Sequence, residues 1–145
     1  MRTAQLVLAC VTLFAGSMKA DPEQQQIIDA VTGFLTALAN EDTAKFQSVT
    51  SPGFYIFDVG ARFDGDKILV LIKTLHAAGK RFEWKVTDPD IHIEGDTAWI
   101  AYVNKGSITD ASGTSPQSWL ESGFLKKRDG KWEIVFMHST RVPKQ

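Results

Sequence analysis

Cysteine is almost missing from this 145-residue chain, because Cys10 is the only one. It lies in an N-terminal segment that we expect to be removed, so the mature chain would have neither disulfides nor thiol chemistry. Its stability would then come from packing alone. The length also leaves no room for a second domain, and 43% hydrophobic residues suit one globular domain with one core.

Signals for nucleic acid, metal and serine-nucleophile chemistry are missing as well. Without Arg2 and Lys19 the chain has 14 basic residues against 17 acidic ones, a net charge of −3, and no basic patch indicates nucleic acid. His76 and His92 have no partner at metal-ligand spacing, and the acidic loop near Asp64 lacks the regular oxygen ligands of a calcium loop. We therefore expect no metal, no cofactor and no nucleic-acid partner.

The first twenty residues have the pattern of a secretory signal peptide. Arg2 gives a positive start, residues 4–16 are nearly all apolar, and small residues follow. The apolar stretch is too short to span a bilayer comfortably. We predict cleavage after Ala20, with cleavage after Ser17 and an uncleaved N-terminal helix as alternatives. The mature domain, residues 21–145, would be secreted or periplasmic, with no membrane association after cleavage.

Helical patterns come early in the mature chain. Asp21 and Pro22 are typical of a helix start. Apolar residues then recur at steps of three and four, as on one face of a helix: Ile27, Ile28, Val31, Phe34, Leu35 and Leu38. Asp42 suits the cap of a short second helix, and Asp64 or Asp66 the cap of a third that Gly79 closes. The pattern predicts three helices.

Strand patterns dominate the second half of the chain. A short aromatic strand at 54–57 follows a turn at Pro52-Gly53, and Gly60–Gly65 reads as a polar loop. Longer alternating segments follow, at 82–86, 91–94, 97–107, 117–127 and 131–141, with a hairpin turn at Asp129-Gly130. Early helices and late antiparallel strands predict an α+β fold. Helices on the concave side of a strongly curved sheet would leave a pocket between the two layers.

Two motifs carry a resemblance to a known superfamily. They are Asp129-Gly130-Lys131-Trp132 with Val135, His138, Thr140 and Pro143 after it, and the segment GDTAWIAY at 95–102. Together they resemble the nuclear transport factor 2-like superfamily, and within it SnoaL-like domains and the association domain of calcium/calmodulin-dependent kinase II. The resemblance implies a cone-shaped fold, with three N-terminal helices packed on a strongly curved antiparallel sheet around one deep pocket. It also implies a homodimer through the open sheet face, and no single activity.

Candidate pocket residues follow from strand alternation. Tyr102 and Asn104 share one face of their strand, and Trp119 and Glu121 share one face of the next. Aligned with the kinase association domain, Asn104 and Gly123 stand at the positions of pocket arginines, whereas Glu121 matches a pocket glutamate. The missing positive charge favours a small neutral or apolar ligand. The predicted binding residues are Tyr102, Asn104, Trp119, Glu121 and His138.

Each candidate also has a structural interpretation. Tyr102 and Trp119 suit a core or a dimer interface, and His138 could simply hydrogen-bond within the sheet. A buried Glu121 needs a partner and would have a raised pKa. A Glu121–His138 pair is the sharpest catalytic hypothesis. We expect an exported accessory protein that binds a small molecule or dimerises. The alternative is an isomerase, cyclase or dehydratase that acts on a small hydrophobic substrate by Glu/His proton transfer.

Overall fold

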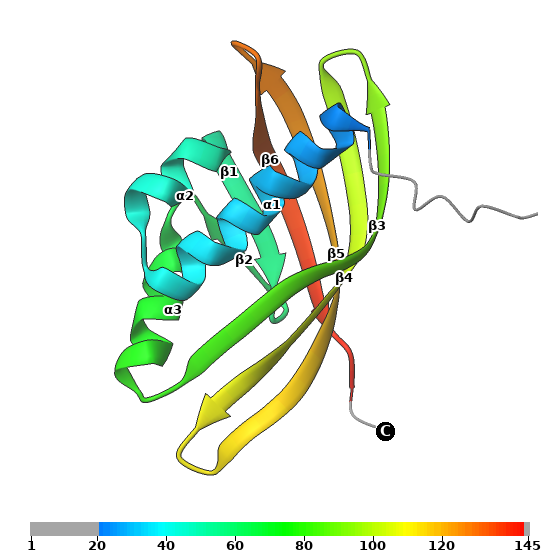
Figure 1. Cartoon of the computed structure of the whole chain (residues 1–145). Coiled ribbons are helices and arrows are strands. Elements are labelled where there is room, and N and C mark those ends of the chain that lie inside the picture. Colours follow the sequence, from blue (N-terminus) through cyan, green and yellow to red (C-terminus); the bar gives the residue numbers. More distant parts are fainter. Residues whose placement is uncertain (1–20, 144–145) are drawn as a thin grey trace, which may run out of the picture.

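The computed structural model describes residues 21–143, so the predicted signal peptide at 1–20 lies outside the described residues. The elements in chain order are α1 (Pro22–Asn40), α2 (Thr43–Val49), β1 (Thr50–Asp58), β2 (Ala61–Asp64), α3 (Lys67–Ala77), β3 (Arg81–Glu94), β4 (Thr97–Asp110), β5 (Gly113–Arg128) and β6 (Lys131–Arg141). The three helices lie together on one side of a curved open sheet (Figure 1). Within residues 21–143, no helix has the length and apolar character needed to cross a membrane.

The six strands form one sheet in the order β2-β1-β6-β5-β4-β3. Four of the neighbouring pairs are antiparallel, and those among β3, β4, β5 and β6 follow the predicted order of late antiparallel strands. The exception is β1, which pairs with β6 in parallel because the chain between them crosses the rest of the sheet. The prediction of an antiparallel sheet is therefore corrected at this junction, and the last strand lies at the centre of the sheet rather than at an edge.

Helix α1 is built as its sequence predicts. Asp21 caps it by accepting a hydrogen bond from the Glu23 amide at 2.8 Å, which satisfies one of the free donors of the first turn. The predicted apolar stripe is buried except for Ile28, which is half-buried. Phe34 in this stripe packs against Phe46 and Phe54 at ring-centroid distances of 5.6 and 5.4 Å. Each fully buried side chain of this size contributes about 1.5–3 kcal/mol, so the stripe fixes α1 on the sheet.

The segment between α2 and α3 differs from the prediction. Pro52 and Gly53 lie inside β1 rather than in a turn, at a register shift between Thr50 and Tyr55. The expected loop at Gly60–Gly65 contains β2, a short edge strand paired with β1. Its four residues are mostly exposed, and the alternation of Ala61 and Phe63 with two polar residues is too short to stand out between the flanking glycines. Only two helices therefore precede the first strand, and α3 follows the first hairpin.

One long strand continues through a position at which the sequence predicts a break between two strands. The predicted strands 82–86 and 91–94 are one strand, β3, with a register shift where Asp88 has a φ of 51° and Pro89 follows. Proline cannot donate to the ladder, so this irregularity falls on an edge strand, where it is tolerated. The predicted turn at Asp129-Gly130 is confirmed, with φ values of 49° and 75° that a tight two-residue hairpin requires.

Candidate functional site

A cavity of about 340 Å³ lies between the helices and the sheet. Its walls are mostly apolar and come from α1, α3 and β3, including Phe34, Leu38, Ile72 and Trp84. The sheet adds a small polar patch, made of Asp58 at the end of β1, Glu121 of β5 and Ser139 of β6. Largely apolar walls with a few converging polar groups are typical of sites for small molecules.

Glu121 is held by donors from both neighbouring strands. The β-sheet register sets Glu121 directly opposite Tyr102 on one side and Ser139 on the other. The Tyr102 hydroxyl donates to Glu121 Oε2, Asn104 Nδ2 donates to the same oxygen at 3.2 Å, and Ser139 Oγ donates to Oε1 at 2.9 Å. Asn104 is itself fixed, because its Oδ1 accepts from the Lys85 amide at 3.0 Å. Three donors directed at one carboxyl group stabilise its ionised form, which can only accept hydrogen bonds.

Burial and charge shift the pKa values of this network. Burial raises the pKa of Glu121, while its bonds from Tyr102, Ser139 and Asn104 act in the opposite direction. Burial, and then the charge of Glu121, raise the pKa of Tyr102 well above its ordinary value. Tyr102 therefore remains a hydrogen-bond donor throughout the physiological pH range.

Asp58 is a second carboxyl group at the same cavity. It stands at the start of the tight β1–β2 turn, where Val59 and Gly60 both have positive φ values, 44° and 77°. Asp58 Oδ1 accepts a hydrogen bond from the Val59 amide at 2.9 Å. Burial raises the pKa of Asp58, and the bonds from Val59 and Ser139, together with the charge of His138, partly offset that rise. Ser139 thus lies between two carboxyl groups.

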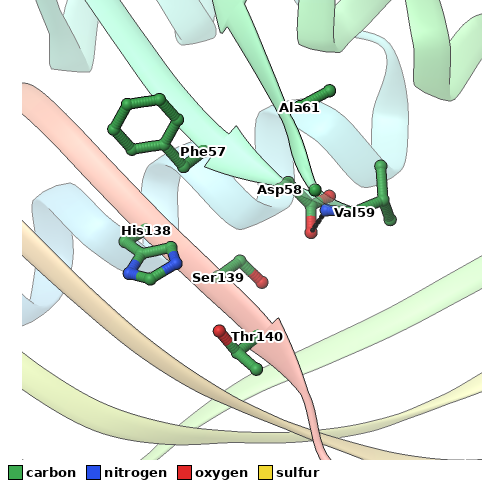
Figure 2. Close-up of a pocket in the computed structure, with 8 residues that line it drawn as sticks. Phe57, Asp58, Val59, Ala61, His138, Ser139 and Thr140 are labelled. Carbon is green, nitrogen blue, oxygen red and sulfur yellow. Dashed lines mark hydrogen bonds between the residues drawn. The ribbon is translucent and has the colours of Figure 1, made fainter.

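The end of β6 separates this cavity from an outer groove. The groove measures about 420 Å³ and shares Asp58, Val59 and Ser139 with the cavity. Figure 2 shows Ser139 on the side of β6 that faces the Asp58 turn, whereas His138 lies beside Phe57. The His138 and Phe57 rings meet edge to face, with centroids 6.2 Å apart.

The structure brings four of the five predicted site residues together. Trp119 and Glu121 line the cavity, and Tyr102 and Asn104 support Glu121. His138 does not join them, because successive side chains of a strand point to opposite faces and Ser139 takes the inward position. The predicted Glu121–His138 pair is therefore replaced by Glu121 and Ser139, with Asp58 nearby.

Sequence reasoning missed two further features of the cavity. The position of Asp58, at the end of the aromatic strand and directly before a Val-Gly turn, marked it as a turn residue. Nothing in the sequence showed that this turn lies at the cavity. Two cations, Lys80 and Arg141, also line the cavity, although the alignment suggested little positive charge. Across residues 21–143, no group of three or more His, Cys, Asp or Glu side chains is arranged to hold a metal ion.

The outward face of the sheet carries a separate apolar surface. Tyr55, Phe57 and Phe136 form an aromatic cluster with centroids 4.9–5.8 Å apart. On β4 and β5, Trp99 is 44% exposed and Leu120 is 58% exposed. Large apolar side chains on an open sheet face are typical of an interaction surface.

Comparison with known proteins identifies the family of the domain. Residues 27–143 match the SnoaL-like domain family. A curated relative, calcium/calmodulin-dependent protein kinase type II subunit delta of Oryctolagus cuniculus, is 27% identical over 128 residues. That match covers 83% of this chain but 24% of the kinase subunit, so the chain spans about a quarter of that relative's length.

Solved structures show the same fold. The association domain of calcium/calmodulin-dependent kinase II from C. elegans aligns with a TM-score of 0.66 and 22% identity, over 81% of this chain and 95% of that one. A candidate dehydratase of the nuclear transport factor 2-like family from Streptomyces avermitilis aligns with a TM-score of 0.70 and 16% identity, over 86% of this chain and 100% of that one. The predicted nuclear transport factor 2-like α+β fold is confirmed, as three helices on a curved, open six-stranded sheet.

Proposed function

The chain belongs to the SnoaL-like domain family, and from that premise we propose that it binds a small, largely apolar molecule in the cavity between its helices and its sheet. One observation carries this proposal. Apolar walls surround about 340 Å³ of space, and Asp58, Ser139 and Glu121 converge at one part of it. The side chains of the polar patch are held by the protein itself, so a ligand would meet a preorganised site.

A cavity-filling substitution tests this proposal. Ile72 lines the cavity from α3 and is only 6% exposed, so Ile72→Trp should occupy the space that a ligand needs. In a thermal-shift screen with small apolar probes, ligands should raise the melting temperature of the unmodified chain but not of Ile72→Trp. Val70→Trp is the matched control, because Val70 lies on the same helix and is 58% exposed. Equal shifts in Ile72→Trp and the unmodified chain would place binding elsewhere.

A proton-transfer enzyme is the second candidate function. The specific observation is that Asp58 and Glu121 line one cavity and both have raised pKa values, which brings a carboxyl group closer to the range useful in acid–base chemistry. Asp58 is the better proton carrier, since three donors already hold Glu121 in place. The reaction class would be isomerisation, cyclisation or dehydration of a small hydrophobic substrate.

Solvent deuterium distinguishes an enzyme from a plain binder. A bound small molecule from which Asp58 removes and returns a carbon-bound proton should gain deuterium at that carbon in heavy water, and mass spectrometry should still detect this deuterium after transfer to ordinary water. Asp58→Asn should abolish this exchange, whereas Asp64→Asn, at an exposed aspartate paired with Arg62, should leave it unchanged. Equal exchange in both variants would remove Asp58 from the mechanism.

The outward sheet face supports the proposal that the chain forms a homodimer. Burial of exposed Trp99, Leu120 and Phe57 in a second copy would remove apolar surface from water. Sedimentation equilibrium should then report a dimer for the unmodified chain and a monomer for Leu120→Asp. A dimer that survives Leu120→Asp unchanged would exclude this face.

Export of the chain is also a proposal, and it rests on the charged, apolar and small-residue order of residues 1–20. Protein recovered from the secreted or periplasmic fraction should begin at Asp21 on N-terminal sequencing. Recovery of a chain that begins at Met1 in the cytoplasmic fraction alone would contradict export.

A further inference from the structure

The polar patch of the cavity, formed by Asp58, Glu121 and Ser139, offers mainly hydrogen-bond acceptors. Its nearby donors are the Tyr102 hydroxyl, the Asn104 amide and the Ser139 hydroxyl, and all three already donate to Glu121. A hydroxyl or amide N–H that serves one strong acceptor is not available to a ligand oxygen. At this patch, a donor group on a ligand therefore fits better than an acceptor.

The acceptors that remain are carboxylate oxygens. An ionised carboxylate has about four lone-pair positions, and the described contacts of Glu121 fill three of them. Asp58 Oδ1 accepts from the Val59 amide while the Ser139 hydroxyl donates to Glu121, so the Asp58 carboxyl group keeps acceptor positions for a ligand. Among the described residues, no ion pair includes Glu121 or Asp58.

The two cations of the cavity wall do not neutralise these carboxylates. Arg141 is exposed, and its Nε donates to Gln117 Oε1 at 2.9 Å. Lys80 is exposed as well, and its charge acts on Asp110. His138 lowers the pKa of Asp58 through its charge, but its ring lies in the outer groove beside Phe57. No ion pair among the described residues thus neutralises the patch, and His138 acts on Asp58 only from the outer groove.

The walls of the cavity suit the body of a cationic ligand. Phe82 and Trp84 stack with ring centroids 5.1 Å apart and an interplanar angle of 11°, and Trp119 lines the cavity beside Glu121. Aromatic faces attract organic cations and also bury apolar surface. An ammonium group brings three donors and a positive charge, whereas an alcohol brings one donor and leaves the charge of the carboxylates unpaired.

From these observations we infer that the ligand is an organic amine, with an apolar body in the cavity and a protonated nitrogen that donates to Asp58 and Glu121. The inference rests on the proposed binding function and names its ligand class. This ligand class differs from the neutral or apolar ligand that the sequence favours. The alignment showed that pocket arginines are missing, but it could not show that Asp58 and Glu121 line the same cavity.

Three probes with one ring system test the inference. Tryptamine, tryptophol and indole-3-acetate share an indole and differ in an ammonium, a hydroxyl or a carboxylate end. Isothermal titration calorimetry on the full chain should give tryptamine an affinity at least about tenfold higher than tryptophol, with indole-3-acetate weakest. Glu121→Gln and Asp58→Asn should each weaken tryptamine about tenfold and leave tryptophol nearly unchanged. Glu94→Gln, at an exposed carboxylate at the end of β3, should leave all three affinities unchanged.

The possible outcomes separate the two proposals. Equal affinities for the three probes, or a preference for indole-3-acetate, would overturn the amine inference and leave the binding function standing. Failure of all three probes to bind would contradict the binding function itself. If Glu121→Gln lowers the melting temperature too far for calorimetry, Asp58→Asn decides the matter, because Asp58 lies at a half-exposed strand end.

Discussion

Removal of the Tyr102 hydroxyl is the sharpest perturbation of the Glu121 network. Tyr102→Phe keeps the ring, which is 96% buried, and removes only the donor to Glu121 Oε2. Asn104 would then be the only donor left on that oxygen. A hydrogen bond to a charged group contributes about 1.5–3 kcal/mol to stability, so we expect the free energy of unfolding to fall by about that amount at neutral pH.

The loss should depend on pH in a defined direction. The bond from Tyr102 lowers the pKa of Glu121, which means that it stabilises the ionised carboxylate more than the protonated acid. Below the pKa of Glu121 the carboxyl group is protonated, and the cost of Tyr102→Phe should shrink. The destabilisation should therefore be largest at neutral pH and decline under acid conditions.

Urea unfolding measured across pH gives the required free energies, and the only other tyrosine supplies the control. Tyr55 lies in the aromatic cluster of the outward face, and its hydroxyl forms no hydrogen bond among the described residues. Tyr55→Phe should change stability by less than about 0.5 kcal/mol at any pH. Equal effects of Tyr102→Phe and Tyr55→Phe, or a cost that does not vary with pH, would refute the hydrogen-bond network described for Glu121.

Three further predictions concern the cavity and its supporting strands. Val59→Gly should raise the free energy of unfolding by about 1 kcal/mol in urea titrations, because the φ of 44° at this position disfavours a β-branched residue. Val59 is 75% exposed, so little packing is lost. A loss of stability would contradict the backbone strain at Val59. Gly106→Ala should lower the free energy of unfolding by about 1–3 kcal/mol, as overpacking of a core does, because the new Cβ would lie 1.8 Å from the Glu83 carbonyl oxygen. An unchanged melting temperature would show that β3 and β4 do not approach this closely. The folded chain binds protons at Glu121 and Asp58 more tightly than the unfolded chain does, because both pKa values are raised on folding. The stability that these two groups contribute is therefore fully present below their unfolded pKa values, and it is lost as the pH rises through their folded pKa values. The double variant Glu121→Gln/Asp58→Asn should therefore lose less stability than the unmodified chain as the pH rises above the unfolded carboxyl pKa of about 4. Parallel pH profiles would argue against the shifts.

Periodicity within one element was enough to predict much of the fold. The stripe from Ile27 to Leu38 repeats every three or four residues, and that spacing alone places one face of α1 on the core. Alternation likewise placed Tyr102 and Asn104 on one face and Trp119 and Glu121 on one face. These relations depend only on neighbours along the same strand.

Relations between strands could not be predicted in the same way. A shift of one residue in register moves a side chain to the other face of a sheet, so the sequence could not decide whether Glu121 meets Ser139 or His138. The parallel pairing of β1 with β6, which carries Asp58 to the cavity, is equally non-local. β2 was missed for a different reason, because a short polar edge strand has no apolar pattern.

The central claim is that the cavity beside Glu121 holds a small molecule, and native mass spectrometry of the chain purified from its own host tests it most directly. The spectra should show a small-molecule adduct on the unmodified chain, and that adduct should be absent from Ile72→Trp, in which the cavity is filled. An unmodified chain that carries no adduct, or an adduct retained equally by Ile72→Trp, would contradict the claim.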